Sequence, residues 1–176
     1  MKNILLLGGA GYIGTVLSTY LTEKKFKVRI LDNLIYKNNH EKKFLELNPE
    51  VEFIKGDLSE LKKNKKIFKN IDVVVLLAGL VGDPITKKYP DLSIKINSEG
   101  NKIAIDTAIN NGINKFIYIS TCSNYGSIPE NDQADENYIL NPISLYAKLK
   151  VEIENYLLSK SGRDFCPTIL RFATAF

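Results

Sequence analysis

The feature that most constrains the fold of this chain is a glycine-rich turn between an apolar run and an amphipathic segment. The apolar run is Asn3–Leu7, and the turn that follows it has the sequence GGAGYIG. Beyond the turn, apolar residues recur at the spacing of one helical face: Ile13, Val16, Leu17, Tyr20 and Leu21. A strand, a glycine turn and a helix in this order let the backbone approach a pyrophosphate, whose charge the N–H groups at the helix N-terminus can meet.

The spacing of this turn, Gly8-x-x-Gly11-x-x-Gly14, differs by one residue from the G-x-G-x-x-G form of dinucleotide sites. A glycine turn alone can be no more than a turn, but its place between a strand and a helix favours phosphate binding. We therefore expect phosphate contacts from Gly8, Gly11, Tyr12, Ile13 and Gly14.

Short apolar runs and helical segments alternate along the rest of the chain. The further runs are Val28–Asp32, Val51–Lys55, Val73–Leu77, Phe116–Ser120 and Thr168–Arg171. They are rich in Val, Ile and Leu without strict alternation, which is typical of parallel strands covered on both faces. Helical segments are expected at about Asp91–Asn111 and Leu145–Ser159. The sequence therefore predicts an α/β fold with a doubly wound parallel sheet in three α/β/α layers, as one domain over residues 1–176.

Composition excludes several classes of function. The net charge is +4, from 24 basic and 20 acidic residues that are interspersed, which favours a solvated surface over nucleic-acid binding. The basic cluster Lys62–Lys69 is expected to be a surface helix. No signal peptide or run long enough for a membrane span is present, so we expect a cytoplasmic protein. Cys122, Cys166 and His40 lack metal-ligand spacing, so we expect no metal site.

Acidic and small residues follow the predicted strands where a dinucleotide would lie. Asp32 comes eighteen residues after Gly14, and with Asn33 beside it could contact the adenosine ribose. A carboxylate there would repel a 2′-phosphate, so NAD is favoured over NADP. The alternative is that Asp32 only caps a turn. Asp57 and Leu58 follow the third strand, where the aspartate could reach the adenine amino group, and Ala78-Gly79 follow the fourth strand, where small residues would let the backbone pass close to the cofactor.

The fifth strand and the last predicted helix carry a possible acid/base group. Tyr146 and Lys150 are four residues apart, so they share a helical face. A nearby ammonium lowers the pKa of a phenol from about 10, which would let Tyr146 act as a general base. Thr121, at the end of the fifth strand, could hydrogen-bond the reacting oxygen. Tyr-x-x-x-Lys by itself is common on surface helices, so the argument depends on the conjunction of the three.

These segments together resemble one known family. GGAGYIG, Asp32, Gly56-Asp57-Leu58, STCSNYG and YAKLK, in this order and spacing, are similar to the extended short-chain dehydrogenase/reductases, the group of NAD-dependent epimerases and dehydratases with a Rossmann fold. The resemblance implies that Tyr146 is the catalytic acid/base, that Lys150 tunes it and binds the nicotinamide ribose, and that Thr121 holds the substrate hydroxyl. It implies, more loosely, that Asn97 lies near the cofactor. It also implies a nucleotide-sugar substrate and a homodimer built from the two helical segments named above.

The chain departs from the family in two informative ways. Cys122-Ser123 stand where 4,6-dehydratases typically have an Asp-Glu pair, so elimination of water is disfavoured. The chain stops at Phe176, so the C-terminal substrate-binding part is expected to be largely absent. We expect an NAD-dependent epimerase that acts on a nucleoside-diphosphate sugar through transient hydride transfer. The alternatives are a net reductase or dehydrogenase and a catalytically silent NAD-binding module.

Overall fold

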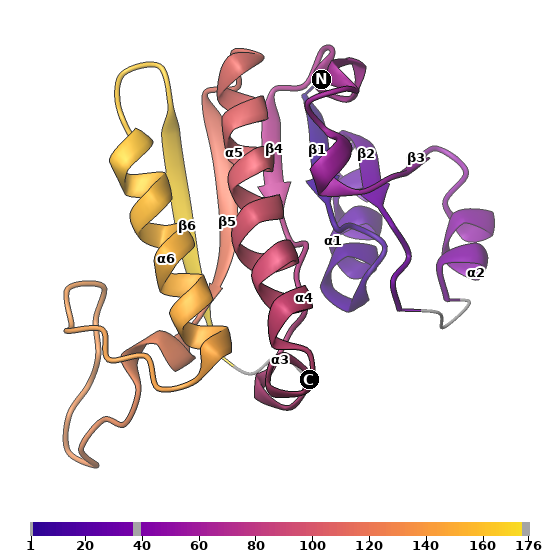
Figure 1. Ribbon diagram of the computed structural model, residues 1–176. Helices are drawn as coiled ribbons and strands as arrows, with labels where there is room; N and C mark the ends of the chain where they lie inside the picture. The colour runs from indigo at the N-terminus through magenta and orange to yellow at the C-terminus, as the bar shows by residue number, and fades with distance from the viewer. Residues whose placement is uncertain (1, 37–39, 174–176) are drawn as a thin grey trace.

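The structure, a computed structural model, describes residues 2–36 and 40–173 and contains a six-stranded sheet (Figure 1). All neighbouring strands are parallel, in the order β3-β2-β1-β4-β5-β6. The strands are β1 (Asn3–Leu7), β2 (Lys27–Asp32), β3 (Glu52–Lys55), β4 (Val73–Leu76), β5 (Lys115–Thr121) and β6 (Cys166–Phe172). The predicted doubly wound sheet is confirmed. Strand order reverses between β1 and β4, and ligands of such sheets bind outside the carboxyl ends of the strands at this point.

Helices lie on both faces of the sheet, with α5 and α6 in front and α1 behind in the view of Figure 1. The α-helices are α1 (Tyr12–Glu23), α2 (His40–Leu47), α3 (Asp83–Lys88), α4 (Pro90–Ile94), α5 (Asn101–Asn110) and α6 (Leu145–Lys160). Between α4 and α5 lies the π-helical segment η3 (Lys95–Gly100), and single 3₁₀ turns form η1 (Leu58–Glu60), η2 (Lys65–Phe68) and η4 (Cys122–Tyr125). Both long helical segments thus occur where the sequence predicts them.

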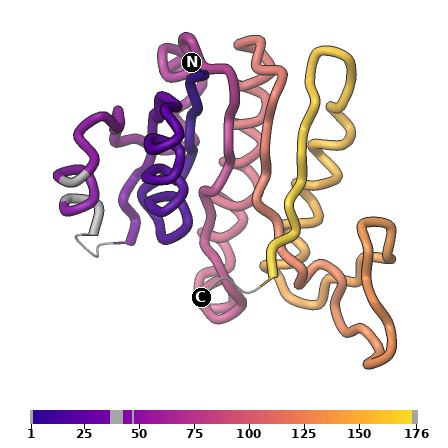
Figure 2. The backbone as a smooth tube through the Cα atoms, turned by 180° about the vertical axis from the view of Figure 1, so that it is seen from behind, coloured from indigo at the N-terminus to yellow at the C-terminus, as the bar shows by residue number. Residues whose placement is uncertain are grey.

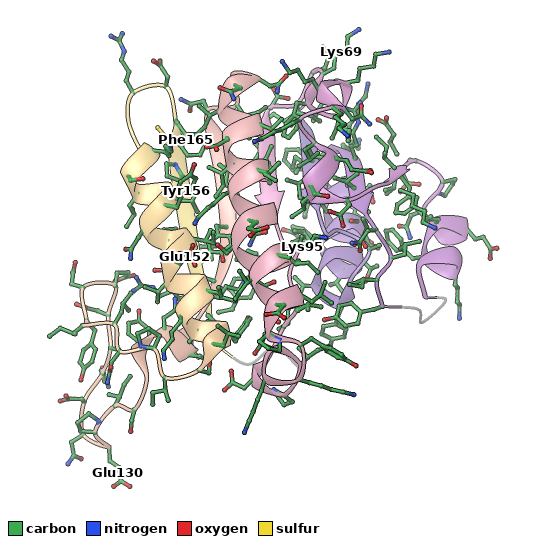
Figure 3. All side chains as sticks on the ribbon, in the orientation of Figure 1. Lys69, Lys95, Glu130, Glu152, Tyr156 and Phe165 are labelled. Carbon is green, nitrogen blue, oxygen red and sulfur yellow. The ribbon has the colours of Figure 1, made fainter. Side chains whose placement is uncertain are left out.

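The core has one part on each face of the sheet. The larger part fills the space between the strands and α5 and α6, and includes Phe116, Tyr118 and Ile153, which are fully buried. The rings of Phe116 and Phe165, the latter labelled in Figure 3, pack with centroids 5.8 Å apart. The smaller part lies between β1, β2 and α1. Seen from behind, β6 has its helix on the far side (Figure 2), and Leu170 and Phe172 of this strand are exposed.

The apolar stripe predicted on α1 is partly wrong. Val16 and Tyr20 are 67% and 55% exposed, whereas Gly14 and Ser18 are buried. A Cβ at Gly14 would lie 2.4 Å from the carbonyl oxygen of Gly9, so the helix makes its closest approach along a line of small residues. The apolar residues flank this line, and only part of the predicted stripe reaches the core.

The basic segment Lys62–Lys69 is also not the surface helix that its spacing predicts. Only the 3₁₀ turn η2 forms there, because Asn64, its N-cap, has φ −119° and ψ 63°, which interrupts any helix. Leu61, Ile67 and Phe68 nevertheless face the core, as their apolar character indicates. The segment is therefore tied down by burial of apolar side chains rather than by helical hydrogen bonds.

The described residues contain neither a membrane-spanning helix nor a metal-binding cluster. None of the helices there is long and apolar enough to cross a membrane. Nor do three His, Cys, Asp or Glu side chains gather closely enough to hold a metal ion among the side chains that the structure describes. Cys122 and Cys166 are both free and exposed.

Candidate cofactor and active site

One cavity of about 1000 Å³ opens at the carboxyl ends of the strands, around the reversal between β1 and β4. This volume is at the upper end of the range for small-molecule sites, about 300–1,000 Å³, and suits an extended ligand. Every site residue that the sequence predicts lines it, with the exception of Asn97. These residues are Gly8, Gly11, Tyr12, Ile13, Gly14, Asp32, Asn33, Asp57, Leu58, Ala78, Gly79, Thr121, Tyr146 and Lys150.

The glycine turn forms one wall of the cavity in a conformation that needs glycine. Gly8 has φ +82°, in the left-handed region, and a Cβ there would lie 2.5 Å from the backbone of Ala78. Gly11 is the N-cap of α1, and no side chain caps the first turn. The first N–H groups of α1 are thus left for an anion, which is the chemistry that a pyrophosphate needs. The turn fits the cofactor that the sequence predicts.

Asp32 ends β2 and makes the turn contacts of the alternative that the sequence leaves open. Its Oδ2 accepts a hydrogen bond of 3.0 Å from the Ala10 N–H, and its Oδ1 accepts one of 2.8 Å from the Leu34 N–H. The carboxylate therefore caps the turn after β2 and braces the glycine turn, while it still lines the cavity. Because each carboxylate oxygen has two acceptor sites, Asp32 can also accept from ribose hydroxyls.

Asp57 is held by neighbours that fix its direction and its charge. It accepts hydrogen bonds from Asn33 Nδ2 at 2.7 Å and from the N–H and hydroxyl of Ser59 at 2.9 Å and 2.7 Å. Partial burial acts to raise the pKa of Asp57, but the bonds from Ser59 and Asn33 and the charge of Lys95 outweigh it and lower the pKa. An ionised Asp57 therefore joins the loop after β2 to η1 at the rim of the cavity.

Asn97, which the resemblance places near the cofactor, does not itself line the cavity. It lies in η3 and is 1% exposed. Its Oδ1 accepts from the Leu80 N–H and its Nδ2 donates to the Leu80 carbonyl, both at 2.8 Å. A Cβ at Gly79 would lie 3.0 Å from this Oδ1, so Gly79 permits the clamp. Asn97 thus fixes the backbone of the loop after β4, and Leu80 of this loop lines the cavity.

Sequence reasoning missed several residues of the cavity wall. Lys95, from η3, lines the cavity and acts electrostatically on Asp57; its place in the molecule is labelled in Figure 3. Nothing in the sequence distinguishes it from the other lysines of helical segments. Leu80 and Val81 also line the cavity, and their position directly after Ala78-Gly79 at the end of β4 could have indicated them.

Thr121, Tyr146 and Lys150 meet at the other end of the cavity. Ser144 is the N-cap of α6, and its side chain accepts from the Ala147 N–H at 3.2 Å, so Tyr146 lies in the first turn and Lys150 one turn later. Tyr146 and Lys150 are both buried, and the Lys150 Nζ lies 5.7 Å from the centroid of the Tyr146 ring. Thr121 ends β5, and its Oγ1 accepts from the Ser123 N–H at 3.2 Å.

The expected lowering of the Tyr146 pKa is wrong for the protein without ligands. Burial raises the pKa of Tyr146 to about 12, and the ionisable groups of Asp83 and Cys122 add to this, although a hydrogen bond with Thr121 acts to lower it. Burial also lowers the pKa of Lys150 to about 8, against the charge of Glu154. Burial thus disfavours the charged form of Lys150, the ammonium that the predicted lowering of the Tyr146 pKa depends on. The Tyr146 hydroxyl is accordingly protonated at neutral pH.

Several known proteins similar to this chain are named as nucleotide-sugar enzymes. Residues 4–176 match the model of the NAD dependent epimerase/dehydratase family. The chain is 34% identical to a dTDP-D-glucose 4,6-dehydratase of Dictyostelium discoideum over 97% of its own length and 43% of that protein. It is 31% identical to UDP-arabinose 4-epimerase 1 of Arabidopsis thaliana, over 98% of this chain and 42% of the relative.

Solved structures show the same likeness. The UDP-Glc/GlcNAc 4-epimerase of Campylobacter jejuni superposes with a TM-score of 0.87 at 28% identity, covering 97% of this chain and 53% of that one. The chain therefore spans about half the length of the proteins it matches. Since the family model matches almost every residue, and the cavity brings the motif residues together, this chain belongs to the NAD dependent epimerase/dehydratase family.

Proposed function

We propose that this chain binds NAD and carries the acid/base site of an epimerase for nucleoside-diphosphate sugars. The observation that carries the proposal is the single cavity, which joins the glycine turn and Asp32 at one end to Thr121, Tyr146 and Lys150 at the other. An extended dinucleotide is the ligand that would occupy both ends. The relatives named above act on dTDP- and UDP-sugars, which supports a nucleotide-sugar as substrate.

In the proposed mechanism, NAD supplies a hydride acceptor that can return the hydride to the opposite face of the same sugar carbon. Tyr146 is protonated at neutral pH without ligands, so it would have to ionise in the complex to take the proton of the sugar hydroxyl, and it would give that proton back to the sugar oxygen at the end of the cycle. Thr121 orients that hydroxyl through its own Oγ1. Lys150 supplies positive charge behind Tyr146, which favours the ionised phenol. The electrons and the proton thus balance, and the sugar leaves with only its configuration changed.

Epimerisation is proposed over 4,6-dehydration because of the residues after Thr121. Cys122 is exposed, and Ser123 is engaged by Thr121, whose hydroxyl donates to the Ser123 Oγ at 3.2 Å. Neither is a carboxyl group that could protonate a leaving hydroxyl and remove a ring proton. One relative is nevertheless a dehydratase, so mass analysis of the product decides: epimerisation keeps the substrate mass and dehydration loses one water.

The experiment is incubation of the chain, and of a C-terminally extended version that supplies the substrate-binding part, with NAD and a panel of UDP- and dTDP-sugars, followed by chromatography and mass spectrometry. The epimerase proposal predicts that the extended version interconverts isomers without build-up of NADH, whereas a net dehydrogenase would accumulate NADH. Tyr146→Phe should abolish turnover and leave NAD affinity nearly unchanged, because only the acid/base hydroxyl is lost. Unimpaired turnover by this variant would show that another group handles the proton.

A catalytically silent NAD-binding module is the second candidate. Two observations favour it. Leu170 and Phe172 of β6 are exposed, and Tyr146 is neutral at pH 7, so it cannot accept a proton in that state. This alternative predicts NAD binding with no product from any sugar. We further propose a homodimer through α5 and α6, which sedimentation of the chain at several concentrations tests. A single monomeric species at every concentration would rule that dimer out.

A further inference from the structure

A buried carboxylate that the proposed mechanism does not use lies one helical turn beyond Lys150. Glu154 of α6 is 1% exposed. It accepts hydrogen bonds from Ser120 Oγ at 2.5 Å and Asn124 Nδ2 at 2.7 Å, and it forms a salt bridge with Arg171 Nη2 at 2.7 Å. These donors come from the end of β5, from η4 and from β6. One side chain therefore ties the helix that carries Tyr146 and Lys150 to three other segments.

Two of the residues that donate to Glu154 lie on either side of Thr121 in the sequence. Ser120 directly precedes it, and Asn124, fully buried, follows it in η4. The Asn124 Nδ2 also donates to Ser120 Oγ at 3.0 Å, so the segment on both sides of Thr121 is bonded to itself and to Glu154. These hydrogen bonds connect the segment that carries Thr121 to α6, the helix that carries Tyr146.

Glu154 is also the negative charge that acts on Lys150. Lys150 is buried. Its Nζ donates to the Ile119 carbonyl at 2.7 Å and lies 4.7 Å from the centroid of the Tyr118 ring, and both partners are neutral. Burial lowers the pKa of Lys150, and the charge of Glu154 opposes this. Other ionisable groups act on the neighbouring tyrosines Tyr118 and Tyr146 from the surrounding elements: Glu152 of α6, Asp83 of α3, Cys122 of η4 and Tyr36 after β2.

We propose that Glu154 is a positioning residue of this site, which holds Thr121 against α6 and supplies the negative charge that keeps Lys150 cationic. The proposal rests on the proposed function in so far as Thr121, Tyr146 and Lys150 are the reacting groups. Glu154 makes no hydrogen bond to the hydroxyl of Thr121 or of Tyr146 and acts through Ser120, Asn124, Arg171 and Lys150.

The test is the titration of Lys150 by NMR in the 176-residue chain with labelled lysine side chains, the signal being assigned with Lys150→Arg. Glu154→Gln should lower the inflection of Lys150 by about one pH unit, because an opposite charge nearby shifts a pKa by that order. Glu154→Asp should give an intermediate value, because the shorter side chain keeps the negative charge but holds it farther from Lys150. The Ser123 amide, bonded to Thr121, should exchange its hydrogen several-fold faster in Glu154→Gln.

Glu152→Gln is the matched control on the same helix. Glu152 pairs with Lys102 of α5 and accepts from Ser98 at 2.7 Å, on the side of α6 that faces α5 (Figure 3). This variant loses a carboxylate of the same helix without touching the Glu154 ties, so the Lys150 inflection and the Ser123 exchange rate should stay as in the wild type. Equal shifts in the two glutamine variants would reveal a general effect of net charge and would overturn the proposal.

An unchanged Lys150 inflection in folded Glu154→Gln also overturns the proposed role of Glu154. If Glu154→Gln does not fold, an unchanged Lys150 inflection in Glu154→Asp overturns that role instead. Neither NMR readout needs turnover, so this inference and the proposed function can fail separately. A chain that binds no NAD and converts no sugar, but shows the Lys150 shift, refutes only the proposed function. A chain that turns over sugar but shows no shift refutes only the role of Glu154.

Discussion

At the scale of single residues, the glycine turn depends on a backbone conformation that a side chain would oppose. Gly8 combines φ +82° with a 2.5 Å approach to the backbone of Ala78, which cannot move aside as a flexible side chain could. Gly8→Ala should therefore destabilise the protein by about 2 kcal/mol or more and weaken NAD binding. Gly162 is the control, since a Cβ there meets nothing within 4 Å. Urea denaturation should show Gly162→Ala close to wild type, and equal losses in both variants would contradict this account.

Lys150 makes stability depend on pH. Its pKa is lowered to about 8 in the folded protein from 10.5, so the unfolded chain binds more protons between these values and stability rises with pH there. The cost of burying the charge is fully present below pH 8 and amounts to about 3 kcal/mol by linkage. The gain in unfolding free energy of Lys150→Met over wild type should accordingly shrink as the pH rises from 8 to 10. Urea denaturation at several pH values measures this, and a difference independent of pH would contradict it.

At the scale of elements, the N-cap of α6 sets where the helix that carries Tyr146 and Lys150 begins. The Ser144 side chain accepts from the Ala147 N–H, and Tyr146 lies in the turn between them. Ser144→Ala should cost about 1 kcal/mol of stability and lower turnover, because the first turn that carries Tyr146 frays. Ser161 at the other end of α6 is exposed, and Ser161→Ala should have little effect on either. Thermal unfolding and sugar turnover of the two variants check this, and matching losses would show that the cap does not matter.

Elements differ in how well the sequence predicts them. The strands were predictable because runs of Val, Ile and Leu are what a sheet covered on both faces needs. The packed face of α1 was not, since Gly14 and Ser18 form its closest line and carry no apolar signal. The same limit applies to Asn97, whose clamp on Leu80 depends on a fold that brings η3 to the loop after β4. Motif spacing located Tyr146 and Lys150, but their pKa values follow from burial, which spacing does not reveal.

At the scale of the whole molecule, topology explains why residues far apart in sequence share one cavity. All six strands are parallel, so the turns after β1, β2, β4 and β5 meet at the same edge of the sheet. The glycine turn, Asp32 and Thr121 each follow a different strand, and α6 then returns Tyr146 to the end of β5. The proposed dinucleotide site and the proposed acid/base site are therefore joined by the fold rather than by any single motif.

The most direct measurement of the central claim is calorimetric titration of the chain with NAD and with NADP. Asp32 lines the cavity, and hydrogen bonds from the Ala10 and Leu34 N–H groups fix its carboxylate. The 2′-phosphate of NADP would therefore be repelled by a negative charge that cannot reorient. The account predicts that NAD binds one site per chain and that NADP binds more than about tenfold more weakly. Asp32→Asn should narrow this difference. Equal affinity for the two cofactors, or no binding of NAD, would contradict it.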